Sequence, residues 1–241
     1  MIRCIAVATI LATNVFLIVD ATTAADNSPP PGFTALFNGK DLTGWHGSVR
    51  IDKLLGGEKE EVAQAQAKAD QQMTEHWKVE DGVLVNDGKG TNLASKQHFK
   101  NFELMVDWKI NPKGDSGIYL RGIPQIQVWD SKSLNTERFA REKDKGSGAL
   151  WNNKKPEDKI PLEFADNEPG QWNTFHVTMV GDKVTVKLNG KLVADNVALE
   201  NIWQPGQPLP ESGPVELQFH PNQDGKADNL YFKNVYIKEL P

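Results

Sequence analysis

Cysteine is almost absent from this sequence of 241 residues. The one cysteine, Cys4, lies in the apolar N-terminal segment. If that segment is removed, the mature chain contains no thiol at all. A disulfide scaffold, a thiolate nucleophile and a cysteine-ligated metal site are then excluded.

An excess of positive charge is also lacking. The chain has 27 Lys and Arg against 32 Asp and Glu, a net charge of −5, and no basic cluster interleaved with aromatic residues. Nucleic-acid binding depends on such a surface, so nucleic acid is not an expected partner. The content of 39% hydrophobic and 24% charged residues is ordinary for a soluble globular protein with one sizeable core.

Several catalytic signatures are missing as well. The sequence contains no Gly-x-Ser-x-Gly motif, P-loop or dinucleotide fingerprint, and its five histidines lack His-x-His or HExxH spacing. The Glu-x-Asp-x-Glu pattern of sandwich-type glucanases is absent too. Asn222, Asp224 and Asp228 give one loop a calcium-like composition, but its glycine is misplaced for an EF-hand. An ordinary turn is the favoured interpretation of that loop.

Residues 1–25 have the pattern of a secretory signal peptide. Arg3 precedes an apolar run from Ile5 to Val19, and small residues follow up to Ala25. The run is short for a membrane span, which needs about 20 residues. We therefore expect an exported, periplasmic or extracellular protein without a membrane span after cleavage. Residues 26–32 are then a linker and residues 33–241 one domain, and an uncleaved N-terminal anchor is the alternative.

Most of the remaining sequence predicts short strands. Phe102 to Ile110 alternates apolar and polar residues, as a strand with one buried face does. Further strands are expected within residues 77–87, 114–130, 175–195, 215–220 and 229–240. The first of these segments turns at Asp81-Gly82, and the third turns at Gly181-Asp182 and again at Asn189-Gly190. This pattern predicts an all-β fold, an antiparallel β-sandwich. Residues 57–76 are expected to form a short inserted helix, and residues 131–171 a long loop that covers a binding groove.

The strand faces opposite the core carry an unusual set of side chains. Strand alternation assigns to them Glu103, Asp107, Tyr119, Arg121, Gln125, Gln127, Trp129, Glu216, Gln218 and His220. Planar hydrogen-bonding groups beside an aromatic ring suit a sugar, and a solvated face with a Glu103–Arg121 salt bridge is the alternative. Glu103 and Asp107 are separated by roughly 13 Å along one strand. Glycosidase carboxylates lie about 5 to 9.5 Å apart, so these two do not form an ordinary catalytic pair.

A series of motifs then points to one family. The sequence contains, in order, "LFNGKDLTGW", "WKVEDGVLV", "FELMVDWKI", "DSGIYLRG", "IQVWD", "GALWNN" and "GPVELQFH". Together they resemble the 3-keto-disaccharide hydrolase domain family. The resemblance implies a concanavalin A-like β-sandwich (jelly roll), usually exported, that cleaves glycosides oxidised to a ketone at sugar carbon 3. In such a reaction a base removes the proton on carbon 2, the group on carbon 1 leaves by elimination, and water adds.

The resemblance also implies roles for individual residues. The family motif positions are Glu103, Asp107, Asp115, Ser116, Arg121, Gln127, Asp130, Gln218 and His220. His220 is the expected base because an imidazole ordinarily titrates near neutral pH, and Arg121 is expected to stabilise the enolate. Asp107 or Asp130 would orient these groups or bind a divalent cation, the one cofactor that the chemistry suggests. The expected carbohydrate contacts are Glu103, Tyr119, Gln125, Gln127, Trp129, Trp151 and Gln218.

Gln125 is a departure from the family pattern, since many relatives have Glu at this position. A neutral amide cannot act as a base. A non-catalytic carbohydrate-binding module is therefore an alternative to the enzyme, and a structural surface domain without a ligand is a third hypothesis.

Overall fold

The computed structural model describes residues 27–133 and 146–241. The predicted signal peptide, the first linker residue and part of the predicted long loop lie outside these ranges.

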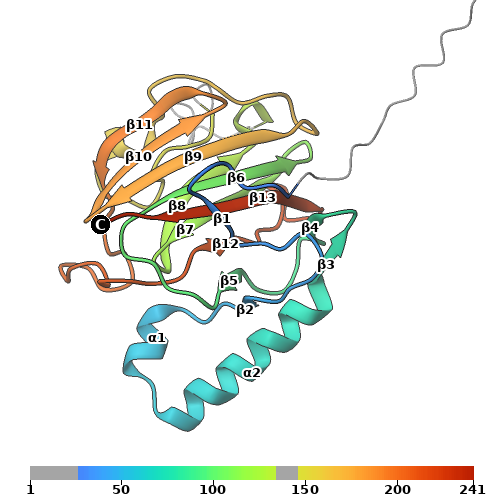
Figure 1. Ribbon diagram of the computed structural model, residues 1–241, viewed down its shortest axis with the longest axis vertical. Coiled ribbons are helices and arrows are strands. Elements are labelled where there is room, and N and C mark those ends of the chain that lie inside the picture. Colours follow the sequence, from blue (N-terminus) through green and yellow to red (C-terminus); the bar gives the residue numbers. More distant parts are fainter. Residues whose placement is uncertain (1–26, 134–145) are drawn as a thin grey trace, which may run out of the picture.

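The described strands form two antiparallel sheets that pack face to face (Figure 1). The larger sheet has the order β11-β10-β9-β6-β13-β4-β3, with β1 paired to β13. Its strands are β1 (Thr34–Ala35), β3 (Trp77–Glu80), β4 (Val83–Asn86), β6 (Phe102–Ile110), β9 (Asn173–Val180), β10 (Lys183–Leu188), β11 (Lys191–Ala198) and β13 (Leu230–Glu239). The smaller sheet has the order β2-β5-β12-β7-β8, built from β2 (Trp45–Gly47), β5 (Leu93–Ser95), β12 (Glu216–Leu217), β7 (Asp115–Leu120) and β8 (Ile123–Trp129). This arrangement confirms the predicted β-sandwich.

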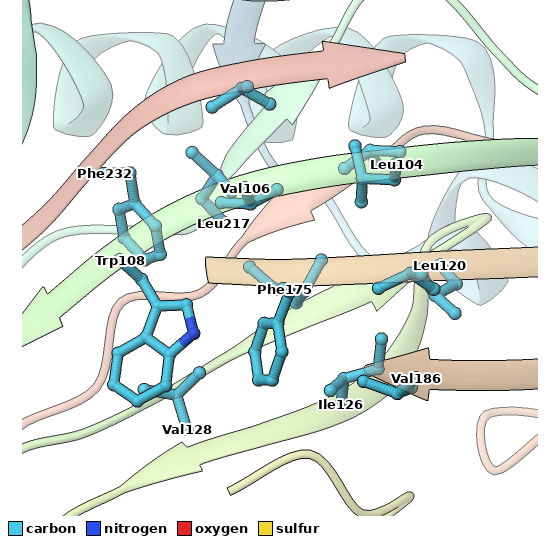
Figure 2. Packing of buried hydrophobic residues seen from close by; sticks show 14 of the residues in the cluster. Leu104, Val106, Trp108, Leu120, Ile126, Val128, Phe175, Val186, Leu217 and Phe232 are labelled. Carbon is cyan, nitrogen blue, oxygen red and sulfur yellow. The ribbon is translucent and has the colours of Figure 1, made fainter. Parts of the chain in front are cut away.

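The core lies between the sheets and explains the alternation in the sequence. Every second residue of β6 is buried, as the pattern from Phe102 to Ile110 predicts. Figure 2 shows Val106, Trp108 and Phe175 of the larger sheet packing toward Ile126 and Val128 of the smaller one. Because the buried side chains are fixed in this way, their neighbours in each strand point outward from the sandwich.

Tight turns join the hairpins. Asp81-Gly82 and Asn189-Gly190 have left-handed backbones at both residues, as the predicted turns require. A third such turn joins β7 to β8, where Arg121 has φ 54° and Gly122 has φ 73°. The placement of Arg121 on a strand face was therefore wrong, because the strand ends at Leu120 and the turn directs the arginine away from the sheet face.

Two helices cover the β2 edge of the smaller sheet (Figure 1). The predicted helix is present as α2 (Lys59–His76), and the unpredicted α1 (Ile51–Gly56) precedes it. The backbone of α2 passes close to β2, since a Cβ on Gly47 would lie 2.0 Å from the Ala69 carbonyl oxygen. No helix in the described ranges is long and apolar enough to cross a membrane.

The described part of the long loop packs along the other edge of the smaller sheet. The Gly148 amide donates to the Gln127 carbonyl, the Gln127 amide donates to the Ala149 carbonyl, and Leu150 bridges to Ile126. A short 3-10 turn follows at Pro156–Lys159. This segment of the predicted groove-covering loop therefore extends the smaller sheet beside β8.

Candidate functional site

Strand register places three rows of polar side chains on the outer face of the smaller sheet. Glu216 of β12 pairs with Tyr119 of β7, and the Gln218 amide bonds to Gly117, which pairs with Gln127. Asp115 pairs with Trp129 at the end of the same hairpin. The rows are therefore Glu216 with Tyr119, then Gln218 with Gln127, and then His220 with Asp115.

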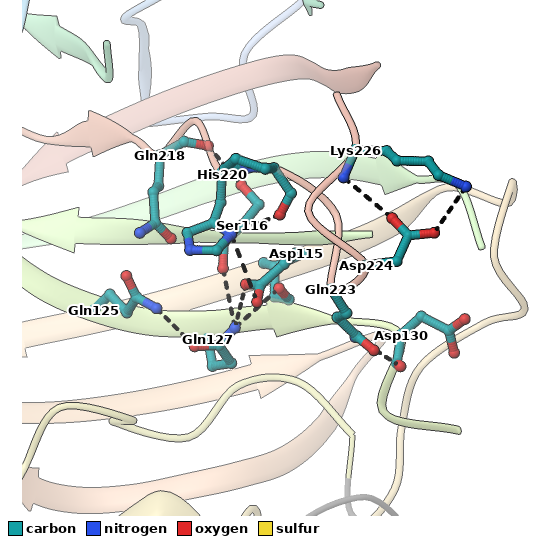
Figure 3. Close-up of polar contacts among 12 residues, drawn as sticks. Asp115, Ser116, Gln125, Gln127, Asp130, Gln218, His220, Gln223, Asp224 and Lys226 are labelled. Carbon is teal, nitrogen blue, oxygen red and sulfur yellow. Dashed lines mark hydrogen bonds and ion pairs between the residues drawn. The ribbon is translucent and has the colours of Figure 1, made fainter. Parts of the chain in front are cut away.

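The His220 row brings an imidazole and a carboxylate together (Figure 3). His220 Nδ1 lies 3.8 Å from Asp115 Oδ2 and 2.7 Å from the Pro221 carbonyl oxygen. A carbonyl only accepts, so the neutral ring carries its proton on Nδ1 and keeps a lone pair on Nε2. Burial raises the pKa of Asp115, and this rise is opposed by the charge of His220 when that ring is protonated and by a hydrogen bond from Gln127. This half-exposed imidazole can accept a proton from a ligand.

Buried amides connect this end of the face to the middle row. Gln125 Nε2 donates to Gln127 Oε1 at 2.6 Å, and Gln127 Nε2 donates to Asp115 Oδ1 at 2.8 Å. Gln218 directly follows β12, and a Cβ on Gly117 would be 2.9 Å from its Oε1. The absent side chain of Gly117 thus makes room for the amides.

A pocket of about 250 Å³ lies at the other end of the face. Its wall includes Ser48, Asn92, Tyr119, Trp203, Glu216 and Gln218. Glu216 is 3% exposed, and its Oε2 accepts hydrogen bonds from Ser48 Oγ at 2.8 Å and Asn92 Nδ2 at 3.1 Å. Burial raises the pKa of Glu216 to about 7 despite these bonds. The pocket therefore contains a carboxyl group that titrates near neutral pH.

Trp203 and Arg50 form another part of this pocket. The Arg50 guanidinium carbon lies 4.3 Å from the centroid of the indole, and Trp203 Nε1 donates to the Gly122 carbonyl. Sequence reasoning missed Ser48, Arg50, Asn92 and Trp203 because they lie outside the strands, where alternation gives no signal. Strand alternation did assign Glu216 to the polar face, although no role was predicted for it.

The comparisons with known proteins agree with this architecture. A family model described as the 3-keto-alpha-glucoside-1,2-lyase-like domain matches residues 32–238. The chain belongs to this family. A protein named 3-keto-disaccharide hydrolase from Bacteroides thetaiotaomicron is 21% identical, over 87% of this chain and 79% of its own length.

Two similar crystal structures come from Parabacteroides distasonis, both of proteins classed provisionally as glycosyl hydrolases. Each is 25% identical to this lyase-like domain. The first has a TM-score of 0.60, and the match covers 88% of this chain and 85% of that structure's chain. The second has a TM-score of 0.61, and the match covers 87% of this chain and 95% of that structure's chain.

Arg121 does not join the other family motif residues on this face. It follows Asp115 by six positions, roughly 20 Å along an extended strand, and lies at the opposite end of the hairpin. Its guanidinium donates to the carbonyl oxygens of Lys100 and Pro210 and lines a separate hollow of about 850 Å³. The expected convergence of Arg121 with His220 is therefore not found.

Glu103 and Asp107 lie on the outer face of the larger sheet, across the core from His220. Glu103 accepts from Lys238 Nζ at 2.8 Å and contacts His176 Nε2 at 2.9 Å, and these partners lower its pKa. Asp107 accepts from Thr174 Oγ1 at 2.6 Å. The predicted single face thus divides between two sheets, and the alternative Glu103–Arg121 salt bridge is not formed.

Residues at the start of the long loop and in its described middle part are held by Asp130, Trp129 and Trp151. Asp130 Oδ2 accepts from the Lys113 amide at 2.9 Å and from Ser133 Oγ at 2.5 Å. Trp129 is 4% exposed, donates from Nε1 to the Gly146 carbonyl, and contacts the Trp151 ring at a centroid distance of 4.7 Å. Trp129 was expected to present its ring to a sugar, but it is buried under residues 146–151.

The described part of the chain contains no preformed cluster of metal-binding side chains. Residues 27–133 and 146–241 bring together no group of three or more His, Asp or Glu side chains that could hold a metal ion. In the calcium-like loop, the Asn222 amide bonds to the Lys226 carbonyl and Asp224 accepts from the Lys226 amide. These contacts are those of an ordinary turn.

Proposed function

We propose that this chain hydrolyses 3-keto-disaccharides on the outer face of the smaller sheet. The family match and the name of the Bacteroides relative support the substrate class. The observation that carries the proposal is the pairing of the half-exposed His220 with Asp115 beside a row of amides. This set offers one general base, and the buried amides Gln125 and Gln127, which were expected to contact the sugar, instead hold Asp115 beside it.

The proposed reaction begins with proton removal from carbon 2, which the adjacent ketone makes acidic. His220 Nε2 takes this proton, and Asp115 stabilises the imidazolium that results. The released electron pair forms an enolate on the carbon 3 oxygen. As the ketone reforms, a double bond develops between carbons 1 and 2 and the bond from carbon 1 to the leaving oxygen breaks. The imidazolium gives its proton to that oxygen, and the second sugar departs with a hydroxyl group. Water then adds to carbon 1, and the neutral His220 takes a proton from this water and transfers it to carbon 2.

The enolate needs a hydrogen-bond donor, which Arg121 cannot supply from the far end of the hairpin. Gln218 is the candidate we propose instead. It lies two positions before His220, and its Nε2 makes a long hydrogen bond of 3.4 Å to the Tyr119 hydroxyl. The second hydrogen of this amide is thus available to the carbon 3 oxygen.

The test is incubation of the purified chain with 3-keto-trehalose in heavy water. Release of glucose and 3-keto-glucose tests hydrolysis, and mass spectrometry tests the mechanism. Elimination and hydration place a solvent deuterium on carbon 2, whereas direct hydrolysis does not. Authentic 3-keto-glucose, incubated in parallel, corrects for spontaneous exchange. Absence of release contradicts the function, and release without deuterium contradicts the mechanism.

Gln125 favours a second candidate function, a non-catalytic carbohydrate-binding module. Its amide is hydrogen-bonded to Gln127 and is neutral. Binding of unoxidised sugars without any cleavage of 3-keto-trehalose would support this function over hydrolysis.

We also propose that the chain is exported, as residues 1–25 predict. Expression of the full sequence in a Gram-negative host, followed by mass measurement of the secreted or periplasmic product, tests this. A product that begins near Asp26 supports export with cleavage, an exported product with an intact Met1 supports the uncleaved anchor, and a protein found only in the cytoplasm contradicts export.

A further inference from the structure

The Glu216 end of the pocket is separated from His220 by more than one sugar ring, and Gln218 lies between them at the near wall. Glu216 precedes His220 by four positions, roughly 13 Å in an extended chain. One ring with hydrogen bonds of the usual length on both sides spans about 8 Å. A sugar whose carbon 2 faces His220 therefore reaches Gln218 at the near wall of the pocket and leaves the Glu216 end unfilled.

We propose that the pocket is a subsite for the second, unoxidised sugar of the disaccharide, with Glu216 and Trp203 as its main contacts. This orientation of the disaccharide rests on the proposed function, whereas the binding of a neutral sugar in the pocket does not. The pocket volume of about 250 Å³ is near the lower end of small-molecule sites, about 300 Å³, as a single sugar ring requires.

One oxygen of Glu216 is available to a ligand. Its Oε2 already accepts from Ser48 and Asn92. Among the described residues, none donates a hydrogen bond to Oε1. This oxygen faces Gly122, and a Cβ added to that glycine would still lie 3.6 Å away from it. A sugar hydroxyl can bond to this oxygen without displacing an existing partner.

An aromatic wall completes the subsite. The Trp203 indole is held in place by its hydrogen bond to the Gly122 carbonyl and by the Arg50 guanidinium. The apolar C–H groups of a sugar pack well against such a ring. Trp203 therefore supplies the apolar contact and Glu216 the polar one.

The charges around the pocket favour a neutral ligand. Arg50 forms an ion pair with Asp52 at 2.5 Å, so its charge is already compensated. Glu216 would repel a phosphate or a carboxylate when ionised, and it is uncharged when protonated. The remaining polar groups of the wall are hydroxyls and amides, which are the usual partners of sugar hydroxyls.

Binding of D-glucose and of trehalose, which carry no ketone and are not substrates, tests the subsite directly. We expect calorimetry to show saturable binding to the full mature chain. Glu216→Ala and Trp203→Ala should each weaken it at least tenfold, and Glu216→Gln, which keeps the shape and an acceptor, should stay within threefold. The matched control is Trp172→Ala. Trp172 is a half-buried tryptophan directly before β9, with the Lys233 ammonium 4.4 Å from the centroid of its ring, and this variant should bind as the wild type does.

Kinetic measurements test whether the sugar that binds in the pocket is the second sugar of the substrate. Glu216→Ala should raise the KM for 3-keto-trehalose at least tenfold and leave the KM for methyl 3-keto-glucoside, which has no second sugar, unchanged. The inference is overturned if neither glucose nor trehalose binds, or if folded Glu216→Ala and Trp203→Ala bind both as the wild type does. If the wild type cleaves neither keto substrate, the proposed function fails, and the glucose titration still decides whether the subsite exists.

Discussion

Glu216 and Tyr119 lie directly opposite each other on β12 and β7, at the wall of the same pocket. Burial raises the pKa of the Glu216 carboxyl to about 7. Burial and the charge of Glu216 together raise the pKa of Tyr119 to about 12. The tyrosine therefore remains a neutral donor, whereas the carboxyl group changes its charge within the physiological pH range.

The pKa of Glu216 predicts a pH-dependent stability that Glu216→Gln removes. Because the folded pKa of about 7 exceeds the ordinary value of 4.5, the native state binds more protons than the unfolded state between these two values. The free energy of unfolding then falls as pH rises through this window, by about 3 kcal/mol at about 1.4 kcal/mol per pH unit. Urea unfolding at pH 5 and pH 8 should show this loss in the wild type and a smaller one in Glu216→Gln.

The control for this measurement is Glu239→Gln, which changes an exposed carboxylate at the end of β13. It should keep the pH dependence of the wild type. Equal pH slopes for Glu216→Gln and the wild type would contradict the assignment of the slope to Glu216.

The β-sandwich could be predicted because its cause is local. Alternation from Phe102 to Ile110 follows from a strand with one buried face, and Asn189-Gly190 is one of few pairs that adopt the left-handed turn. The same alternation cannot say to which sheet a strand belongs. Glu103 and Gln127 both point away from the core, but on opposite sides of the sandwich.

The candidate site was harder to predict because part of it comes from loops. Alternation continued through Leu120 into Arg121 would place the arginine on the polar face, yet the turn begins there. Arg50 and Trp203 lie outside the strands and meet only when the chain folds. Nothing in their local sequence indicates that contact.

His220→Ala should lower kcat/KM for 3-keto-trehalose by about 10² to 10⁴, the usual range for loss of a general base. Asp115→Asn should have a smaller effect, about tenfold, because it removes the carboxylate that faces the imidazolium but keeps an acceptor for Gln127. Steady-state kinetics at several pH values measure both changes.

His176→Ala is the matched control for the His220 variant, because His176 also contacts a carboxylate but lies on the outer face of the larger sheet. Its kcat/KM should equal that of the wild type. Full activity in a folded His220→Ala protein would exclude His220 as the base.

Arg121→Met should reduce stability and leave catalysis intact. The guanidinium donates to the carbonyl oxygens of Lys100 and Pro210, and its loss leaves partly buried acceptors without a donor. Hydrogen bonds to charged groups contribute about 1.5 to 3 kcal/mol, so a loss of about 2 kcal/mol in the free energy of unfolding is expected. A fall of more than tenfold in kcat/KM, measured well below the melting temperature, would show instead that Arg121 acts on the substrate.

Gly117→Ala should disturb the face and the fold together. An added Cβ would lie 2.9 Å from Gln218 Oε1, 3.0 Å from Gln125 Cδ and 3.0 Å from the Ile126 carbonyl oxygen. The amide ends can rotate away, but the carbonyl belongs to the backbone of the paired strand and cannot. We expect a loss of about 1 to 3 kcal/mol in urea unfolding, as overpacking usually causes, and a higher KM because Gln218 is displaced. Gly56→Ala, where nothing lies within 4 Å of the added Cβ, provides the control and should be neutral or slightly stabilising. If both variants unfold at the wild-type urea concentration, the close packing of the amides against Gly117 is wrong, and with it the position of Gln218 on which the proposed enolate contact depends.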